Sequence, residues 1–308
     1  MARTFLELMQ AACDEIGIPQ PSSIIGSVDD QSRQLLALAN REGKDFSVMA
    51  NSRGGWQNLH HEYVFQTNVP AATTGNTIAG SKIITNIPDT SGIEAQYWFA
   101  DGDGFPYQAK VVSVDSSTQV TIDRPITVTG TGVAIQFAQG AYAMPSDFEY
   151  FVQKTFWDGA MRWELLGPIS AQEKNILRYG VAVSGPRRRF YVRENRMFID
   201  PVPATTNESL AFDYFSNAWC KSAAGAYQNK WQADDDTFVL DDDCFIQGMK
   251  WRFLRAKGMD YGQEKTDYDA ECMRVLARDG GNRALPLGRR DTLTLLSNAN
   301  IADTGYGQ

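Results

Sequence analysis

The sequence predicts an α+β protein with a helical bundle core and short antiparallel strands, an inserted all-β domain and an extended C-terminal arm. Three observations predict this fold class. Apolar residues recur at helical spacing near both ends of the chain, the middle is rich in Thr, Ser, Gly, Val and Ile, and the last residues show no core pattern. Helical spacing indicates one buried helix face, whereas short β-branched runs between turns indicate strands. We therefore divide the chain into a core of residues 1–67 and 140–280, an inserted β domain of residues 68–139 and an arm of residues 281–308.

In the first part of the core, the sequence predicts two helices followed by a strand. Apolar residues of the first helix fall on one face: Phe5, Leu6, Leu8, Met9, Ala12, Cys13 and Ile16. Gly17 and Pro19 end this helix, because Gly favours the left-handed cap and Pro cannot continue the helix. Ser27 and Asp30 resemble a capping box and predict the start of the second helix. Residues 62–67 alternate like a strand.

In the inserted domain, the sequence predicts five or so short strands between turns. In the second part of the core, it predicts both strands and helices. A capping box at Ser170–Glu173 opens a short helix. Three strands follow, RRRFYVREN, RMFIDP and SLAFDYFSNAW, and a tight turn at Glu194–Asn195 joins the first two. We expect two further helices at about 241–257 and 262–278.

Charge and cysteine usage restrict the classes of function. The formal net charge is −8, which argues against tight wrapping of nucleic acid but not against DNA that passes through a channel. The first residues contain no long apolar run, so we expect neither a signal peptide nor a membrane helix. The four cysteines are far apart and form no CxxC pair, so we expect reduced, mostly buried thiols: Cys13, Cys220, Cys244 and Cys272.

Six aspartates in the stretch DDDTFVLDDD, residues 234–243, suggest either a metal site or acids at the start of a helix. Asp241 is a good N-cap for the apolar segment that follows, and the next two acids favour the positive end of its dipole. No Glu or His recurs at the four-residue spacing that a shared ion needs. We therefore interpret these residues as capping and solvated acids.

Other catalytic candidates lack partners. Asp101 and Asp103 resemble the start of a calcium loop whose later ligand positions are missing. His60 and His61 are the only histidines, and neighbours on a strand point to opposite faces. Glu149 and Glu164 lie near aromatic residues, like the acid and base of a sugar-cleaving enzyme. We expect no catalytic residue, no metal site and no cofactor, and hence no enzyme.

A dense basic segment is the most distinctive polar feature of the chain. Its five arginines fall within ten residues: Arg187, Arg188, Arg189, Arg193 and Arg196. Phe190 and Tyr191 lie between them. Such a cluster can contact DNA phosphates or an acidic neighbouring subunit, and the plain alternative is a solvated face of a hairpin.

Five segments carry a resemblance to a known family: GPISAQE, MFIDPVP, LAFDYFSNAW, the long segment from FVLDDDCF to ARDGG, and the N-terminal segment from FLELMQ to LALAN. They resemble the head-to-tail adaptor (connector) proteins of tailed bacteriophages. The resemblance covers about two-thirds of the chain and skips the β insertion. It implies a ring, usually dodecameric, that lies below the portal and surrounds the DNA channel with a helical bundle. It also implies a C-terminal arm that docks on the portal, and a downstream nozzle or tube protein that the ring receives.

On this resemblance the chain is a virion protein of the tail connector that is assembled in the host cytoplasm, without a membrane partner. Genomic DNA would pass without sequence-specific binding, and the β insertion would lie at the ring periphery, near a neighbour or a tail fibre. The portal-docking residues would lie in the arm: Arg283, Leu285, Leu287, Arg289, Arg290, Leu293 and Leu295. Two alternatives stay open: a tail-associated cell-wall or polysaccharide hydrolase, and a tail-tube or fibre-attachment protein.

Overall fold

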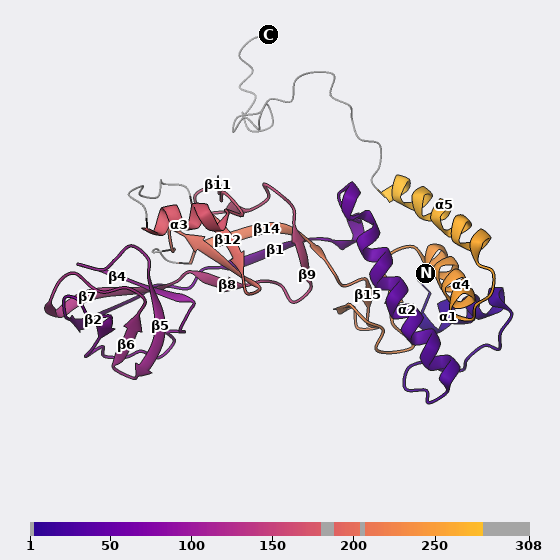
Figure 1. Ribbon diagram of the computed structural model, residues 1–308, viewed down its shortest axis with the longest axis horizontal. Helices are drawn as coiled ribbons and strands as arrows, with labels where there is room; N and C mark the ends of the chain where they lie inside the picture. Colours follow the sequence, from indigo (N-terminus) through magenta and orange to yellow (C-terminus); the bar gives the residue numbers. More distant parts are fainter. Residues whose placement is uncertain (1–2, 180–187, 204–206, 280–308) are drawn as a thin grey trace, which may run out of the picture.

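The computed structural model describes residues 3–179, 188–203 and 207–279. These residues form an elongated molecule with a helical unit at one end, a six-stranded sheet at the other and a middle β body between them (Figure 1). Its α-helices are α1 (Phe5–Ile16), α2 (Asp30–Met49), α3 (Ala171–Tyr179), α4 (Asp242–Ala256) and α5 (Gly262–Asp279). Two short 3-10 helices follow α2, namely η1 (Ala50–Arg53) and η2 (Gln57–Leu59).

The helical unit contains α1, α2, α4 and α5 around one hydrophobic cluster. Helix α4 packs against the other three, because its buried residues occur around most of its circumference rather than on one stripe. A small sheet of β16 (Tyr227–Gln228), β15 (Cys220–Lys221) and β17 (Thr237–Phe238) closes this cluster. Aromatic rings fill it, and Phe5 stacks on Trp231 with ring centroids 4.4 Å apart.

The six-stranded sheet is antiparallel and nearly closes into a barrel. Its order is β2 (Ala71–Thr77), β7 (Gly130–Gln139), β4 (Trp98–Gly102), β5 (Ala109–Ser116), β6 (Gln119–Ile122) and β3 (Ile83–Ile84). A bridge between Asn76 and Thr85 brings the two edge strands together. The sheet encloses its own hydrophobic cluster, because inward β-branched and aromatic residues alternate with outward polar ones along the strands.

The middle body consists of two sheets that face each other. One contains β1 (His60–Gln66), β14 (Ser209–Ser216), β10 (Trp157–Asp158) and β11 (Trp163–Glu164), with β9 (Phe148–Phe151) also paired to β14. The other is the hairpin β12 (Arg189–Arg193) and β13 (Arg196–Asp200), extended by β8 (Ala141–Ala143). The two share one aromatic cluster, and a second, smaller cluster joins the hairpin to the six-stranded sheet through Phe198 and Phe99.

The predicted helical bundle core is wrong, because the described chain is mostly β-sheet. Strands build two of the three bodies, and four of the five described helices gather at one end. Helical periodicity is visible over long segments, whereas β10, β11, β15, β16 and β17 are each two residues long, too short for alternation to reveal them. The division of the chain into core, insertion and arm stays a prediction, and the arm lies outside the described residues.

Most predicted local signals appear in the structure. Asp241 caps α4 by accepting from the Cys244 amide, as predicted. Asp29, not Ser27, caps α2 by accepting from the Ser32 amide, and the Ser27 hydroxyl accepts from the Asp29 amide two residues further on. The Ser170 hydroxyl accepts from the Glu173 amide at the start of α3. Glu194 and Asn195 both have positive φ, 53° and 54°, as a tight hairpin turn requires. All four cysteines are free and buried.

Candidate functional site

The arginines of the basic segment have different environments in the structure. Arg188 donates to both oxygens of Glu208, one at 2.7 Å, and lies 3.4 Å from Asp158. Its side chain is 15% exposed and each of its two partners 5%, and burial lowers its pKa. Arg188 is therefore engaged in a buried ion pair inside the middle body and does not face a phosphate.

The other hairpin arginines differ in exposure. The guanidinium of Arg196 lies 3.7 Å from the ring centroid of Tyr97, a cation–π contact that joins the hairpin to the six-stranded sheet. Arg189 is half-buried opposite Asp200 on β13. Arg193 is 63% exposed and pairs with Glu194 at 3.6 Å. Arg187 lies outside the described residues, so Arg193 is the only one of the described four with a freely accessible charge.

A groove of about 480 Å³ lies beside Arg193, between the start of α3 and β12. We name it the cationic groove and define it by Ser170, Ala171, Lys174, Tyr191, Val192 and Arg193. The ammonium of Lys174 lies 5.4 Å from the ring centroid of Tyr191. Burial lowers the pKa of Lys174, and the nearby charges of Arg193 and Arg178 lower it further. An anion in this groove would relieve that repulsion.

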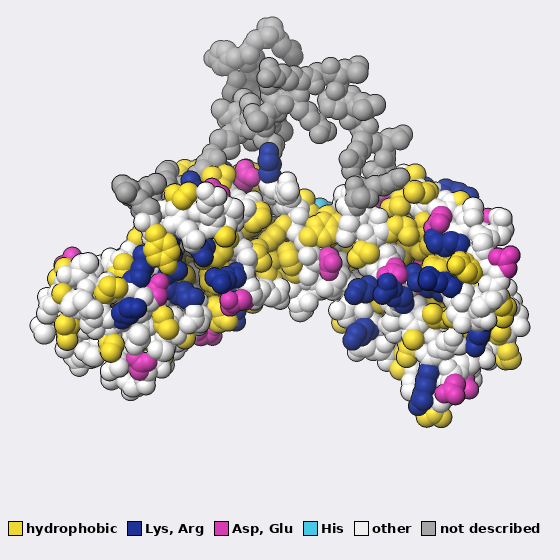
Figure 2. Space-filling model, viewed as in Figure 1, with side chains coloured by type: hydrophobic (Ala, Val, Ile, Leu, Met, Phe, Trp, Pro, Cys, Tyr) yellow, Lys and Arg dark blue, Asp and Glu magenta, His cyan; other side chains and the backbone are white. Residues whose placement is uncertain are grey.

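A second basic cluster joins α3 to the six-stranded sheet. Arg178 forms an ion pair with Asp123, and Arg124 donates to the Arg178 and Gln108 carbonyls. Tyr179 lies under both guanidinium groups, at 5.2 Å and 5.6 Å. Lys and Arg side chains gather over this part of the surface in Figure 2. Sequence reasoning missed this cluster, although the four-residue spacing of Lys174 and Arg178 on a predicted helix indicates one charged face.

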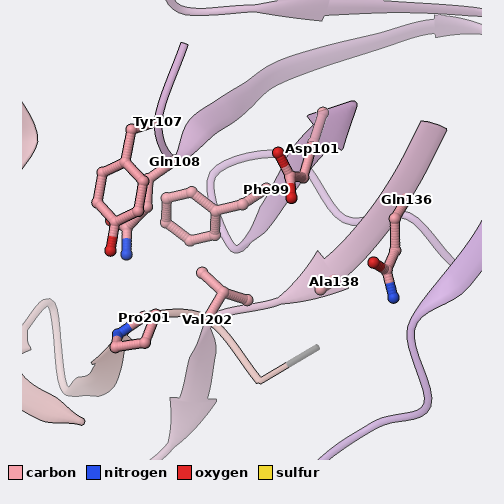
Figure 3. Close-up of a pocket in the computed structure, with 9 residues that line it drawn as sticks. Phe99, Asp101, Tyr107, Gln108, Gln136, Ala138, Pro201 and Val202 are labelled. Atoms are coloured by element: carbon pink, nitrogen blue, oxygen red, sulfur yellow. The ribbon is translucent and has the colours of Figure 1, made fainter. Parts of the chain in front are cut away.

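A cavity of about 180 Å³ lies between the six-stranded sheet and the end of β13 (Figure 3). Phe99, Asp101 and Val202 are among the residues that line it. Beside it, the Tyr107 hydroxyl donates to Asp200 at 2.7 Å, and burial raises the pKa of Asp200. Pockets for small molecules usually measure about 300–1,000 Å³. This cavity is smaller, so it fits a packing defect at the junction better than a substrate site.

The aspartate stretch organises the backbone. Asp234 accepts from the amides of Ile24 and Ile25 and from the Ser23 hydroxyl. Asp236 accepts from two amides of its own loop. Five of these six acids therefore have structural partners, because Asp241 caps α4 and both Asp242 and Asp243 contact Arg3. In residues 3–179, 188–203 and 207–279, no group of His, Cys, Asp and Glu is placed to hold a metal ion.

The structure does not bring the remaining catalytic candidates, Glu149, Glu164 and the two histidines, into one site. Glu149 lies beside the end of β14, while Glu164 is opposite Trp157, which pairs with Ala211. Strand spacing places the two glutamates on the order of 14 Å apart. Glycosidase carboxyl groups are about 5–9.5 Å apart, so this pair does not match that arrangement. His60 lies 3.5 Å from Asp213, and burial lowers the pKa of His61.

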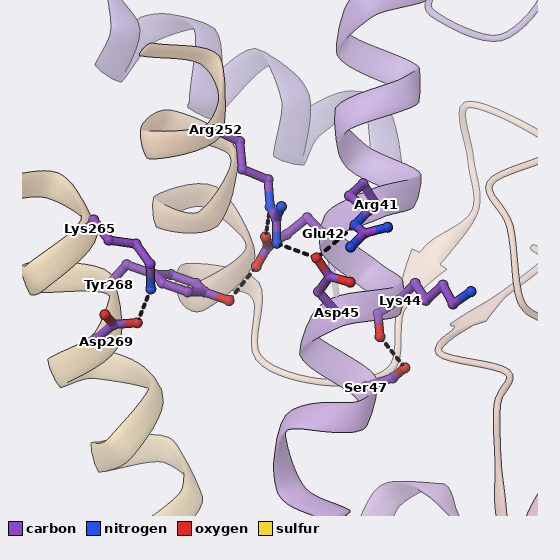
Figure 4. A network of polar contacts seen from close by, with 9 residues as sticks. All are labelled: Arg41, Glu42, Lys44, Asp45, Ser47, Arg252, Lys265, Tyr268 and Asp269. Carbon is purple, nitrogen blue, oxygen red and sulfur yellow. Dashed lines mark hydrogen bonds and ion pairs between the residues drawn. The ribbon is translucent and has the colours of Figure 1, made fainter. Parts of the chain in front are cut away.

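A buried polar network that the sequence did not predict lies between α2, α4 and α5 (Figure 4). Glu42 is 0% exposed and accepts from Arg252 and from the Tyr268 hydroxyl. Arg252 also donates to Asp45 at 3.0 Å. Burial raises the pKa of Glu42, and the two donors oppose that shift. Because its members come from three helices, the network stabilises the helical unit rather than forming an open site.

The predicted portal-docking residues, from Arg283 to Leu295, lie outside the described residues. Within the described part of the chain, we find no helix that is both long and apolar enough to cross a membrane. Comparisons with protein-family models and with curated proteins find no match for this chain.

Proposed function

We propose that this chain is a structural virion protein, a head-to-tail adaptor whose copies form a ring, dodecameric by resemblance, between the portal and the tail of a bacteriophage. One observation carries the proposal. The two long segments that resemble adaptors, residues 5–40 and 238–281, are far apart in sequence, yet their described helices pack into one unit with a single hydrophobic cluster. If each segment resembled the adaptors only by chance, there would be no reason for the two segments to pack into the same body.

The proposed partners follow from the position of such a ring. The portal would lie above it, a nozzle or tube protein of the tail below it, and genomic DNA would pass through it without sequence-specific binding. The net charge of −8 supports passage, because tight DNA binding depends on basic groups that release counterions. The six-stranded sheet lies at the far end of the elongated chain from the helical unit (Figure 1), which supports a place at the ring periphery.

Particle mass tests this function directly. The purified chain is mixed with the portal ring of its own phage, and the mass of the particles is measured beside each component alone. We expect a gain that corresponds to one chain per portal subunit. Absence of any gain would overturn the adaptor function, and clearing of peptidoglycan or capsule that one carboxylate-to-amide change abolishes would replace it with a hydrolase.

A shortened chain of residues 1–280, which lacks the arm of residues 281–308, tests the proposed arm in the same assay. We expect an unchanged circular dichroism spectrum, because the described bodies are complete without the arm. We also expect loss of the mass gain, since the arm would supply Arg283, Leu285, Leu287, Arg289, Arg290, Leu293 and Leu295 to the portal. Normal attachment of the shortened chain would remove the docking role from these residues.

A further inference from the structure

Two open surfaces lie on opposite sides of the middle body. The aromatic cluster of this body lies between its two sheets, because Phe212 of β14 and Phe190 of β12 both belong to it. Residues that alternate with Phe212 on β14 therefore point away from the hairpin, and Tyr191, next to Phe190, points away from β14. The outward face of one sheet and the groove beside the other are thus directed away from each other.

The outward face of the first sheet is apolar along one row, with one acid at the end of that row and two acids in the next row. Val64, Ala211 and Trp157 are direct cross-strand partners, so their side chains lie on the same face. Val64 is 55% exposed and Trp157 37%. Glu164 continues the row opposite Trp157, and Glu62 pairs with Asp213 in the next row. We name this the acidic sheet face and define it by Glu62, Val64, Trp157, Glu164, Ala211 and Asp213.

Exposure of this kind indicates a binding surface. An exposed tryptophan beside an exposed valine, with charges at the margin, is the composition of the centre and rim of a protein interface. Among the described residues, the three carboxylates of the face have one basic side chain within ion-pair distance, the imidazole of His60 at 3.5 Å from Asp213. The face therefore offers uncompensated negative charge around an apolar centre.

The cationic groove offers the complementary pattern. Tyr191 forms the groove wall, while Lys174 and Arg193 supply positive charge at its sides. Both surfaces thus combine apolar groups with a predominant charge, and the signs are opposite, although Glu194 lies 3.6 Å from Arg193. Because both occur on every copy of the chain and point in different directions, they suit a contact in which each copy uses a different surface for each neighbour.

We propose that neighbouring copies of this chain contact head to tail, with the acidic sheet face of one copy against the cationic groove of the next. This inference rests on the proposed adaptor function, since a contact between unlike surfaces builds a closed ring when the rotation between copies closes. Glu62 and Glu164 would face Lys174 and Arg193, and Trp157 would lie against Tyr191. A ring contact of this kind leaves the helical unit free for the channel and the portal.

Charge reversal tests the contact on the full chain. The groove variant carries Lys174→Glu and Arg193→Glu, and the sheet variant carries Glu62→Lys and Glu164→Lys. A matched control, Lys44→Glu with Lys82→Glu, changes the net charge by the same amount as the groove variant at exposed positions outside both surfaces. Sedimentation velocity over a wide concentration range, at low and high salt, measures self-association.

We expect the wild-type chain and the control to associate at low salt, and each reversal variant alone to stay monomeric. An equal mixture of the two reversal variants should associate again, because every contact then joins opposite charges. A chain with all four changes should associate with itself but not with the wild-type chain. A wild-type chain that stays monomeric throughout, or variants that associate like the wild type, would overturn the inference.

The outcome separates this inference from the function on which it rests. If the reversal variants add the same mass to the portal ring as the wild-type chain, the head-to-tail contact is wrong and the adaptor function stands. If the wild-type chain adds no mass, the adaptor function fails. If the groove variant associates normally but loses binding to a DNA duplex, the groove contacts phosphate instead, which also overturns the inference.

Discussion

Tyr268 donates a hydrogen bond of 2.7 Å to Oε1 of Glu42, although the two residues are 226 positions apart in the chain. Glu42 lies on α2 and Tyr268 on α5, and Arg252 of α4 donates to the same carboxylate. One buried acid therefore ties together both ends of the chain. The helical unit depends on this contact because, without Glu42, the buried Tyr268 hydroxyl would lose its acceptor and Arg252 would keep only Asp45.

Removal of the Glu42 carboxylate should strongly destabilise the fold. Glu42→Ala leaves the charge of Arg252 and the hydroxyl of Tyr268 without their shared acceptor, and breaking a buried ion pair in this way costs about 3–5 kcal/mol. Urea unfolding measures the change in free energy. Asp103→Asn, at an exposed turn, serves as the control and should change stability by less than about 0.5 kcal/mol. Equal stability of both variants would contradict a structural role for Glu42.

Gly248 of α4 lies against the same carboxylate. A Cβ atom at this position would be 2.2 Å from Glu42 Oε1, and the carboxylate cannot move without loss of its donors. Gly248→Ala should therefore destabilise the protein by about 1–3 kcal/mol through overpacking, although Ala favours a helix interior. Gly262→Ala, whose nearest contact would be 3.5 Å, is the matched control and should be neutral. Thermal unfolding compares the two, and a stabilising Gly248→Ala would refute the close contact.

Two arginines of the basic segment should respond in opposite ways to truncation. Arg188→Ala leaves Glu208 and Asp158 buried without their cation and should cost about 3–5 kcal/mol. Arg193→Ala removes an exposed charge and should change stability by less than about 0.5 kcal/mol. Denaturant midpoints measured side by side check this. Similar losses for both variants would mean that Arg188 is not a buried structural residue.

Acid should weaken the protein partly through Asp234. Burial raises the pKa of this carboxyl, but the Ser23 hydroxyl and the amides of Ile25 and Ile24 outweigh burial and hold the pKa below its ordinary value. A carboxyl with a lowered pKa contributes stability above its unfolded pKa of 3.8 and loses that contribution as the pH falls through the folded value. Asp234→Asn should therefore flatten the decline of unfolding free energy at acid pH.

The neighbouring, exposed Asp235 provides the control for that titration. Asp235→Asn should keep the acid decline of the wild-type chain, because its side chain does not organise the loop at Ile24. Unfolding is followed by fluorescence at a series of pH values from neutral to strongly acidic. An Asp234→Asn variant with the wild-type slope would show that another group causes the decline.

The sequence by itself determined the features that depend on a few neighbouring residues. The Asp241 cap, the Ser170 cap and the turn at Glu194 each arise within four positions, so residue type and spacing were enough to predict them. The buried, reduced state of the cysteines followed from their number and separation. The second helix was predicted two residues from its true cap, because Ser27 and Asp29 are both residues that cap well.

Tertiary structure alone decided which of these segments meet. The proportion of β-sheet was underestimated because two-residue strands are too short to show alternation, and one of them, β10, pairs with β14 more than 50 residues later in the chain. The same applies to charge: Arg188 and Arg193 look alike in the sequence, and only the position of Glu208 makes one buried and the other exposed. Local signals have a short range, whereas burial depends on partners that the folded chain brings from far away.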